Sequence, residues 1–416
     1  MTYTLNTPIL SGKIRAISSK SEAHRELICA ALADRPTKIK CTDTNRDIDA
    51  TVSCLNSLGA SITREKDIFN VTPIKNVIKH ASLDCGESGS TLRFIIPVAA
   101  AIGAECKITM HGRLPSRPLS PMYELLSEHG ADMSDLGTNP FYVGGRLCGG
   151  TMSIAANVSS QFISGLLFAL VLCNEPSSLR LTENVESFSY VRMTLDALKL
   201  FGADIKYKDK TFYINPMTHY ISPGESVVGG DWSNSAFFLC AGAIGKYPVT
   251  VSGLDIKSSQ GDKEILNILE RMGANVSLSD IDITVARQKL HATDIDASQI
   301  PDLVPIIAVT ASVAQGTSRI YNASRLRLKE SDRIESVCDL INSLGGHAVP
   351  TDDGMLIDGV SSLYGGRVNS YNDHRIAMSA AVASTVCQTC VTVDGMEAIE
   401  KSYPLFISDF EHLHKK

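Results

Sequence analysis

The stretch Leu55–Ser61, LNSLGAS, decides how this chain folds, because it returns four more times in nearly the same form. The other copies are LSEHGAD, LKLFGAD, LERMGAN and INSLGGH, and the glycines of the five copies are Gly59, Gly130, Gly202, Gly273 and Gly345. A glycine directly after an apolar helical stretch can take the left-handed conformation that ends a helix. The nearly constant spacing between these glycines indicates one repeated folding unit.

A second helix recurs in the same register. Its six copies begin near Lys20, Ser90, Gln161, Trp232, Leu303 and His374, and these starts keep the spacing of the glycines. The period exceeds that of most solenoid repeats, so we expect six small α/β subdomains.

The sixth unit has no room for its return strands, because Gly345 lies only one period before the end of the sequence. We expect the segment Thr2–Ile17, with strand-like TYTLN and KIRAI, to complete it. The segment Ile221–Ser233 is rich in Gly, Ser and Pro and precedes the fourth unit, as a linker would. We therefore predict two lobes of three units, residues 19–229 and residues 1–18 with 230–416, with a hinge near 18–19 and 229–230.

Composition limits the functions open to the chain. With 416 residues and 44% hydrophobic content, it can fill two cores. It has no run of about 18 apolar residues and no signal-peptide pattern, so we expect no membrane association and a cytoplasmic location. We also expect a monomer. The net charge of −6 argues against nucleic acid as a partner.

The eleven cysteines are scattered through apolar segments, and their odd number favours reduced, buried thiols. Cys387 and Cys390 form a CxxC, but the sequence offers no second CxxC or histidine cluster to complete a zinc site. We therefore expect neither a metal nor a cofactor.

Unusual polar residues gather just before or at the starts of both sets of predicted helices. The first set carries Lys20, Ser21, Arg25, Ser90, Arg93, Ser159, Ser160, Gln161, Asp302, His374 and Arg375. The second set carries Arg117, Ser187, Tyr190, Lys329, Glu330, Arg333 and Lys401. A helix start offers free backbone N–H groups and the positive end of the dipole, which together bind anions. If both lobes point these starts at one cleft, it would suit a ligand with several phosphates or carboxylates.

Simpler interpretations remain open for single residues. A serine at a helix start is more often a cap than a ligand. Asp302, which lies between two prolines in IPDLVP, could equally be a cap or a base that binds a hydroxyl. Glu330, set between a lysine and arginines, could belong to an ion-pair network on an exposed helix or could exchange a proton with a substrate. Cations at helix starts oppose the dipole, so the whole set favours an anionic ligand.

In order along the chain, the segments SKSEAHR, GESGSTLR, SRPL, SSQF, GDWSNSAFF, IPDLVP, RLKESDR, YNDHR and KSYPLF resemble the 5-enolpyruvylshikimate-3-phosphate synthase family. The resemblance runs end to end, and LKESDR and NDHR are its most specific parts. It implies an α/β fold of two lobes, each with three βαβαββ units arranged like an inverse α/β barrel, that closes over its substrates. It also implies transfer of the enolpyruvyl group of phosphoenolpyruvate to the 5-hydroxyl of shikimate 3-phosphate, with release of phosphate.

The resemblance also implies roles for single residues. Shikimate 3-phosphate would be bound by Lys20, Ser21, Arg25, Ser159, Ser160, Gln161, Ser187, Tyr190, Asp302, Arg325 and Lys329. Phosphoenolpyruvate would be bound by Lys20, Gly89, Arg117, Gln161, Arg333, Arg375 and Lys401. Supporting positions would be Ser90, Arg93, Asp373 and His374. Lys20 and Asp302 would assist the attacking hydroxyl, and Glu330 would protonate the methylene carbon.

Two positions depart from the family pattern, and two alternatives remain. Glu87 stands where many members have Asn, and Arg325 stands where some members have Asn.

One alternative is UDP-N-acetylglucosamine 1-carboxyvinyltransferase, which usually has Lys-Asn near its N-terminus and a reactive cysteine in a mobile loop. Here Ser21 follows Lys20, and Met110–Leu119 contains no cysteine. The other alternative is a noncatalytic anion-binding protein of the same fold.

Overall fold

The computed structural model describes residues 1–414. The chain divides into two compact units, here called the first unit, Ser18–Val228, and the second unit, Met1–Ile17 with Gly229–Lys416. Each unit is described separately below. Each contains three sheets, and each sheet belongs to one repeat of the sequence.

Two repeats of the first unit have the full order strand, helix, strand, helix, strand, strand. One consists of β6 His80–Asp84, α3 Gly89–Ile102, β7 Glu105–Thr109, α4 Met122–Glu128, β8 Ala131–Met133 and β9 Phe141–Gly145, with η1 Leu114–Ser116 before α4. The next consists of β10 Thr151–Ile154, α5 Ser160–Leu170, β11 Ser177–Leu181, α6 Phe188–Leu200, β12 Lys206–Lys208 and β13 Thr211–Ile214. Their sheets have the orders β6-β7-β9-β8 and β10-β11-β13-β12, in which only the first pair is parallel.

The remaining repeat of the first unit takes its first strand from the far end of the unit. Its consecutive elements are α1 Lys20–Ala31, β3 Thr37–Lys40, α2 Arg46–Ser57, β4 Ser61–Glu65 and β5 Ile68–Thr72. The missing strand is β14, Glu225–Val227, which pairs parallel with β3. The segment that the sequence suggests as a linker therefore also closes a sheet.

The second unit follows the same plan with borrowed strands at its start and end. The fourth repeat contains α7 Trp232–Ile244, β15 Val249–Ser252, η2 Gly261–Glu264, α8 Ile265–Arg271, β16 Asn275–Leu278 and β17 Asp282–Ala286. The fifth contains β18 Asp294–Asp296, α9 Val304–Ala311, β19 Thr317–Tyr321, η3 Ser324–Leu328, α10 Arg333–Ser343, β20 His347–Thr351 and β21 Gly354–Asp358. The sixth contains β22 Gly366–Asn369, α11 His374–Ala383, η4 Ser384–Val386, β23 Val391–Asp394, η5 Met396–Lys401 and α12 Phe406–His412.

The N-terminal segment serves two different sheets. Strand β1, Thr2–Leu5, pairs antiparallel with β23 in the sixth repeat, as expected for a missing return strand. Strand β2, Gly12–Arg15, instead pairs parallel with β15 and supplies the first strand of the fourth repeat. The expectation that KIRAI completes the sixth unit is therefore wrong, and the sixth sheet has three strands, β1-β23-β22.

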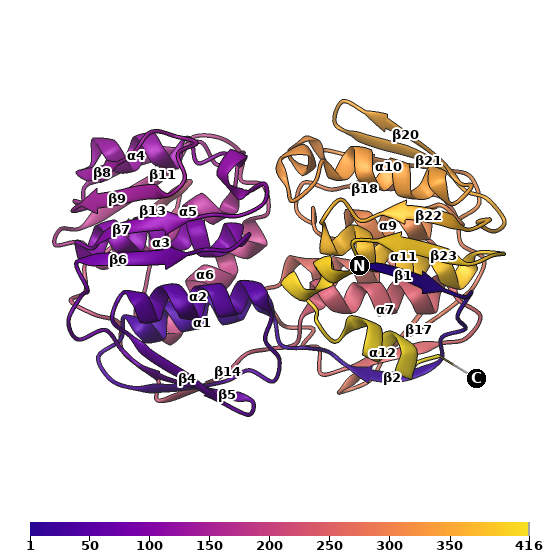
Figure 1. Cartoon of the computed structure of the whole chain (residues 1–416), viewed down its shortest axis with the longest axis horizontal. Coiled ribbons are helices and arrows are strands. Elements are labelled where there is room, and N and C mark those ends of the chain that lie inside the picture. The colour runs from indigo at the N-terminus through magenta and orange to yellow at the C-terminus, as the bar shows by residue number, and fades with distance from the viewer. Residues whose placement is uncertain (415–416) are drawn as a thin grey trace. The chain divides into compact units, whose positions relative to one another are not determined.

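The helices of the recurring second set form the core of each unit, and the sheets lie outside them. In α3, 12 of 14 residues are buried, and every residue of α9 and α11 is buried. A helix that is buried on all sides must be surrounded by other elements. Strands such as β6 alternate exposed and buried residues, as expected for a sheet with one face in water. Figure 1 shows α1 and α2 between the sheet of β4, β5 and β14 and the sheet of β6, β7 and β9.

The repeat signature ends helices in the predicted way. Gly59, Gly130, Gly202, Gly273 and Gly345 have φ values of 116°, 98°, 84°, 95° and 82°. Each follows the last turn of α2, α4, α6, α8 or α10. The predicted α/β class and the related units are therefore confirmed, with core helices inside and sheets outside as in an inverse barrel.

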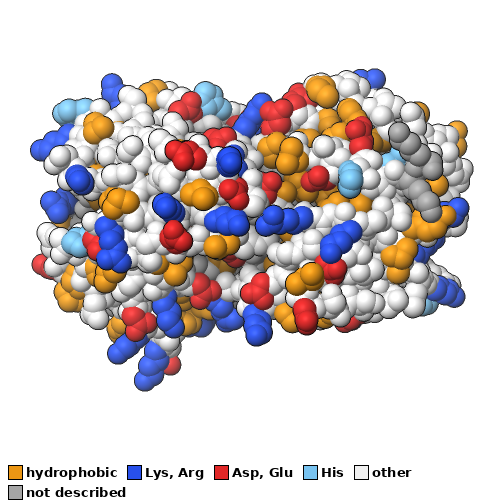
Figure 2. Space-filling model, turned by 90° about the horizontal axis from the view of Figure 1, so that it is seen from below, with side chains coloured by type: hydrophobic (Ala, Val, Ile, Leu, Met, Phe, Trp, Pro, Cys, Tyr) orange, Lys and Arg blue, Asp and Glu red, His pale blue; other side chains and the backbone are white. Residues whose placement is uncertain are grey.

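The surface carries charges of both signs. On the face in Figure 2, Lys and Arg side chains are interspersed with Asp and Glu side chains. Among the described residues, none of the helices has the length and apolarity needed to cross a membrane.

Candidate active site

The start of α1 places Lys20 against an acidic residue of α2. Ser19 caps α1 by accepting a hydrogen bond from the backbone N–H of Glu22 at 3.4 Å. Lys20 Nζ lies 2.8 Å from Asp47 Oδ2, and these side chains are only 15% and 16% exposed. The carboxylate offsets the unfavourable position of a cation at a helix start. The sequence did not single out Asp47, because an acidic residue in the first turn of a helix is an ordinary feature.

Arg25 is buried and held by groups from α1 and α6. Its Nη1 donates to the Ser21 carbonyl oxygen at 2.5 Å, its Nε to Thr194 Oγ1 at 2.9 Å, and its Nη2 to the Tyr190 carbonyl oxygen at 2.9 Å. The guanidinium also lies 5.2 Å from the centre of the Phe94 ring. Burial lowers the pKa of Arg25 to about 10, so it remains cationic at neutral pH. These contacts join Ser21, Arg25 and Tyr190 in one cluster.

The glycine at position 89 lets two arginine side chains approach the start of α3. A Cβ atom at Gly89 would lie 2.8 Å from Arg117 Nη1 and 3.2 Å from Arg93 Nη1. Two guanidinium groups therefore pack against the first residue of the helix. Ser88 caps this helix, since its Oγ accepts a hydrogen bond from the backbone N–H of Thr91 at 3.2 Å. A helix start flanked by arginines suits a phosphate or carboxylate.

Gln161 joins the start of α5 to the start of α3. Its Oε1 accepts a hydrogen bond from Arg93 Nη1 at 2.6 Å, and its Nε2 donates to Ser90 Oγ at 2.9 Å. Arg93 Nη2 also donates to the Pro118 carbonyl oxygen at 3.0 Å, beside Arg117. Arg93 therefore contacts the predicted ligand Gln161 and the residue that follows Arg117.

The predicted serines differ in their local roles. Ser159 is the N-cap of α5, and its Oγ accepts a hydrogen bond from the Gln161 N–H at 3.3 Å. Ser160 is the first residue of that helix and is 7% exposed. Ser187 is the N-cap residue of α6, is 1% exposed, and has a left-handed φ of 53°. That backbone conformation is costly for a residue other than glycine, and such strain is concentrated at functional sites.

In the second unit, Asp302 is surrounded by cations. Its Oδ1 lies 2.8 Å from Arg333 Nη1 and 3.3 Å from Lys329 Nζ. Its Oδ2 lies 3.1 Å from Arg375 Nη2. Burial alone would raise the pKa of Asp302, but Arg375, Lys329 and Arg333 hold it well below its ordinary value. The N-cap residue of α9 is Leu303, so the capping interpretation of Asp302 is not supported.

Arg333 is the first residue of α10 and the most enclosed cation of this cluster. Its side chain is 1% exposed, and it pairs with three carboxylates: Asp302, Glu330 Oε2 at 2.8 Å and Asp373 Oδ2 at 2.8 Å. Burial lowers the pKa of Arg333, but the three carboxylates raise it more, to above its ordinary value. Glu330 thus belongs to an ion-pair network, but the network is largely buried and not on an exposed helix.

Asp373 connects this cluster to α11. Its Oδ1 accepts a hydrogen bond from the Arg375 backbone N–H at 2.9 Å, and its Oδ2 accepts from Ser331 Oγ at 3.1 Å. His374 Nδ1 lies 3.9 Å from Asp373 Oδ1. The carboxylate therefore fixes both Arg333 and the start of the helix that carries Arg375.

Three other predicted residues lie near the same elements. Burial lowers the pKa of Lys329 to about 8, although Asp302 opposes the shift. Lys401 Nζ donates to the Asn372 carbonyl oxygen at 2.7 Å. Arg325 Nη2 donates to the Ser298 carbonyl oxygen at 2.7 Å.

The sequence pattern places three further cations at the starts of α-helices, and the structure does not. Arg117 follows η1 in an extended conformation, and α4 begins only at Met122, after a cis Ser120–Pro121 bond. Lys329 directly follows η3, and Lys401 is the last residue of η5. Short 3₁₀ helices occupy these places, and their sequences carry no helical periodicity to reveal them.

Glu87, which departs from the family pattern, lies against the loop before Arg117. A Cβ atom at Gly112 would lie 2.5 Å from Glu87 Oε2, and Gly112 has a left-handed φ of 54°. The carboxylate therefore packs on the backbone of a loop whose other end carries a predicted phosphoenolpyruvate ligand.

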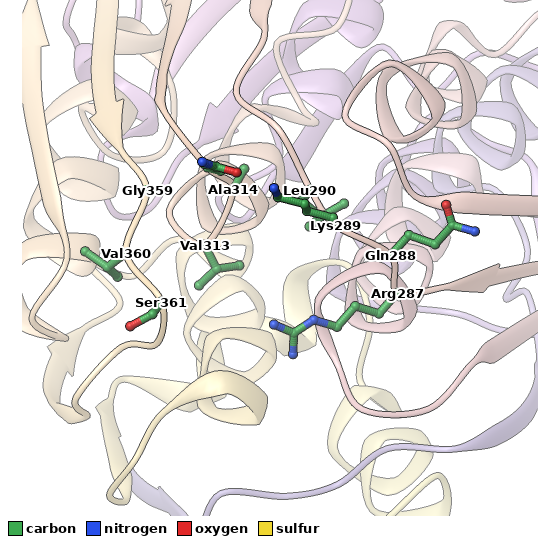
Figure 3. Close-up of a pocket in the computed structure, with 10 residues that line it drawn as sticks. Arg287, Gln288, Lys289, Leu290, Val313, Ala314, Gly359, Val360 and Ser361 are labelled. Atoms are coloured by element: carbon green, nitrogen blue, oxygen red, sulfur yellow. The ribbon is translucent and has the colours of Figure 1, made fainter.

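A pocket of about 400 Å³ in the second unit contains none of the residues predicted to act on substrates. It is lined by Arg287, Gln288, Lys289, Leu290, Val313, Ala314, Gln315, Gly359, Val360 and Ser361 (Figure 3). Its charged side chains are exposed, so its chemistry differs from that of the buried ion pairs.

The eleven cysteines are all free, and nine of them are buried, whereas Cys148 and Cys390 are exposed. Within the part of the chain that the structure describes, no group of three or more His, Cys, Asp or Glu residues is placed to hold a metal ion.

Comparisons with known proteins identify the family of this chain. Residues 6–410 match the family described as EPSP synthase (3-phosphoshikimate 1-carboxyvinyltransferase). A 3-phosphoshikimate 1-carboxyvinyltransferase from Clostridium botulinum (strain Eklund 17B) is 39% identical over 423 residues, which cover 99% of this chain and 97% of that protein. The protein of the same name from Clostridium perfringens (strain ATCC 13124) is 40% identical over 409 residues, which cover 97% of this chain and 96% of that protein.

A solved structure supports the fold alone. The EPSP synthase from Acinetobacter baumannii has a TM-score of 0.81 and 24% sequence identity, and the match covers 99% of this chain and 98% of that one. The match to the family extends over nearly the whole chain, and the sequence relatives exceed one third identity. The chain therefore belongs to the EPSP synthase family.

Proposed function

We propose that this protein transfers the enolpyruvyl group of phosphoenolpyruvate to the 5-hydroxyl of shikimate 3-phosphate and releases inorganic phosphate. The activity is an enolpyruvyl transfer in the shikimate pathway, which leads to chorismate and the aromatic amino acids. One observation carries the proposal: the family match spans residues 6–410, which include both buried charge clusters.

We propose that the cluster of the first unit binds shikimate 3-phosphate. Ser21 and Arg25 would hold its carboxylate, and Ser159, Ser160 and Ser187 would hold its phosphate. The Arg25 guanidinium is already oriented by Thr194 and Tyr190, so little side-chain entropy is lost on binding. Gln161 and Tyr190 of the first unit would line the site. Lys329 and Arg325 of the second unit would add positive charge near the phosphate.

Phosphoenolpyruvate would be bound by groups from both clusters. Arg117, Gly89, Gln161 and Lys20 would come from the first, and Arg333, Arg375 and Lys401 from the second. Arginine pairs with carboxylate and phosphate through two parallel hydrogen bonds, so these side chains suit a ligand that carries both groups.

In the reaction, the 5-hydroxyl oxygen would attack the central carbon of phosphoenolpyruvate while its methylene carbon gains a proton. Asp302 would accept the hydroxyl proton, the Lys20 ammonium would stabilise the negative charge that develops on the hydroxyl oxygen, and Glu330 would protonate the methylene carbon. The tetrahedral intermediate then loses phosphate from the central carbon and a proton from the methyl carbon. Arg333 holds Glu330 Oε2 at 2.8 Å, which orients the acid.

The deciding experiment measures phosphate release from phosphoenolpyruvate with each of two acceptors. We expect release with shikimate 3-phosphate and none with UDP-N-acetylglucosamine. The reverse result would identify the alternative carboxyvinyltransferase. Tight binding of shikimate 3-phosphate without turnover would identify a noncatalytic binding protein. A monomeric state and a cytoplasmic location stay predictions of the sequence.

A further inference from the structure

A chain of buried side-chain hydrogen bonds crosses the first unit and joins α1, α2 and α3. His24 Nδ1 of α1 lies 2.7 Å from Thr51 Oγ1 of α2. Thr51 Oγ1 lies 2.7 Å from Thr91 Oγ1 of α3. These three side chains are at most 1% exposed. None of them is a predicted ligand, and the sequence did not single them out.

The other end of this hydrogen-bond chain reaches Lys20 and the start of α3, which the proposed function places against phosphoenolpyruvate. Thr91 Oγ1 lies 2.8 Å from Ser88 Oγ, which caps the helix that begins at Gly89. It also lies 3.3 Å from the Asp47 carbonyl oxygen. The carboxylate of Asp47 holds Lys20 Nζ at 2.8 Å. The threonine hydroxyls therefore connect the support of Lys20 with the start of α3.

The threonine hydroxyls can each bond to two neighbours at once, so they can link the side chains on either side of them. Each threonine hydroxyl has one proton to donate and two lone pairs to accept with. Burial, together with the charges of Lys20 and Arg25, lowers the pKa of His24 well below its ordinary value, so the ring is neutral. Among the described residues, His24 Nε2 has no hydrogen-bond partner. The Thr51 hydroxyl is thus the partner that orients a deeply buried ring.

Such an arrangement does little for stability by itself. A buried hydrogen bond contributes a modest net free energy, and an unpartnered buried nitrogen is costly. A connected polar network in a core does restrict the relative placement of the elements it joins. Here those elements are the three helices that carry Lys20, Asp47 and Gly89.

We propose that Thr51 and Thr91 are positioning residues for the transfer reaction, which hold the Asp47–Lys20 pair and the start of α3 at a fixed separation. The proposal rests on the proposed function, because it assigns Lys20 and Gly89 to one substrate. Its consequence is that loss of either hydroxyl weakens phosphoenolpyruvate binding although neither threonine touches the ligand.

The test replaces Thr51 with valine, which keeps the shape and removes the hydroxyl. We expect KM for phosphoenolpyruvate to rise about tenfold in Thr51→Val, with a smaller rise in KM for shikimate 3-phosphate. Thr51→Ser keeps a hydroxyl and is expected to restore most of the affinity. If Thr51→Val does not fold, Thr51→Ala and Thr91→Val serve the same comparison.

The first unit offers a matched control. Thr37 Oγ1 lies 2.7 Å from Ser222 Oγ, and both residues are 1% exposed, but neither is connected to a predicted ligand. Thr37→Val is expected to lower the melting temperature and to leave both KM values unchanged. In Thr51→Val combined with Thr91→Val, the effects on KM should be less than additive, because either change breaks the same chain.

The outcomes separate this inference from the function itself. If the unmodified protein releases no phosphate with shikimate 3-phosphate, the proposed function fails. If it is active and Thr51→Val loses only melting temperature, with KM unchanged as in Thr37→Val, the positioning role is overturned. A rise in KM that Thr51→Ser does not reverse would also overturn it.

Discussion

Arg375 reaches Asp302 with both terminal nitrogens: Nη1 donates to the Asp302 carbonyl oxygen at 3.0 Å, and Nη2 donates to the carboxylate at 3.1 Å. The same carboxylate also accepts from Arg333 and Lys329. The surrounding cations lower the pKa of the carboxylate and so make it a weaker base, while their hydrogen bonds fix its orientation. Asp302 can therefore accept a proton only when the attacking 5-hydroxyl of the substrate becomes more acidic in the transition state.

Asp302→Asn should damage both stability and turnover. It leaves cations buried without their shared carboxylate, and breaking such a pair costs about 3 kcal/mol. We expect kcat to fall by about 100-fold or more, as for loss of a general base. Urea unfolding and steady-state kinetics would measure the two effects.

The control for this change is Asp296→Asn. Asp296 Oδ2 accepts a hydrogen bond from Asn322 at 3.1 Å, but Asp296 is exposed. Asp296→Asn should change neither the free energy of unfolding nor kcat appreciably. A kcat in Asp302→Asn equal to that of the control would remove Asp302 from the mechanism.

Glu330→Gln should separate catalysis from binding. Glutamine keeps an oxygen that can accept from Arg333, so the ion-pair cluster loses one charge but keeps its shape. We expect kcat to fall by about 10² to 10⁴, the usual contribution of a general acid. The dissociation constant of shikimate 3-phosphate, measured by calorimetry, should change by less than about threefold. Unchanged turnover would show that Glu330 does not transfer the proton.

The sequence predicted those parts of the fold that depend on local patterns. The five glycines mark helix ends because only their own backbone conformation is involved. The first residues of the core helices lie within one position of the expected starts, as at Lys20, Trp232 and His374. The placement of β2 and β14 was missed, because a short strand carries no signal that names its partner in a distant repeat.

The sequence likewise indicated part of the buried charge clusters, whose roles toward substrates stay predictions. Unusual cations such as Arg333 and Arg375 drew attention because a helix start disfavours them. Their protein partners were harder to find, since Asp47 looks like an ordinary first-turn acid and Thr51 like an ordinary core threonine. Only the packing of α1, α2 and α3 shows what these side chains hold.

Gly89→Ala should weaken phosphoenolpyruvate binding. The added methyl group would lie 2.8 Å from Arg117 Nη1, so the guanidinium must move away from the start of α3. We expect KM for phosphoenolpyruvate to rise about tenfold or more, with a smaller change in kcat. Gly103→Ala, at the other end of α3, has open space but a left-handed φ of 70°. It should lose stability and keep its KM; equal KM values in the two variants would contradict the prediction.

The affinity for shikimate 3-phosphate should fall as pH rises through about 8, where Lys329 of the ligand-free protein loses its proton. Well above that pH, the dissociation constant should increase about tenfold per pH unit, because binding must restore the charge. Lys329→Arg should flatten the dependence, since a guanidinium stays charged. Calorimetry between about pH 6.5 and pH 9.5, with Lys40→Arg as an exposed control, would measure it. Identical pH profiles for the protein and Lys329→Arg would exclude this lysine.

Glu26 should make the stability of the protein depend on pH. The residue is 7% exposed, and its carboxylate accepts a hydrogen bond from Ser226 Oγ of β14 at 2.6 Å. Burial raises the pKa of Glu26 from 4.5 to about 7 in the folded protein, and Glu22 adds to the shift. The folded state thus binds more protons between these values. Protonation of Glu26 therefore stabilises the folded state, and this contribution is fully present below pH 4.5 and is lost as pH rises through about 7.

Each pKa unit corresponds to about 1.4 kcal/mol, so the free energy of unfolding should fall by about 3 kcal/mol across this range from Glu26 alone. Glu26→Gln cannot ionise and should lose that part of the dependence. Ser226→Ala removes a donor that favours the charged form, so its dependence should be steeper. Glu124→Gln replaces an exposed carboxylate that accepts from Ser120 Oγ at 2.8 Å and serves as the control. If unfolding in urea at about pH 5.5 and pH 8 gives Glu26→Gln the same pH dependence as Glu124→Gln, Glu26 is not the titrating group.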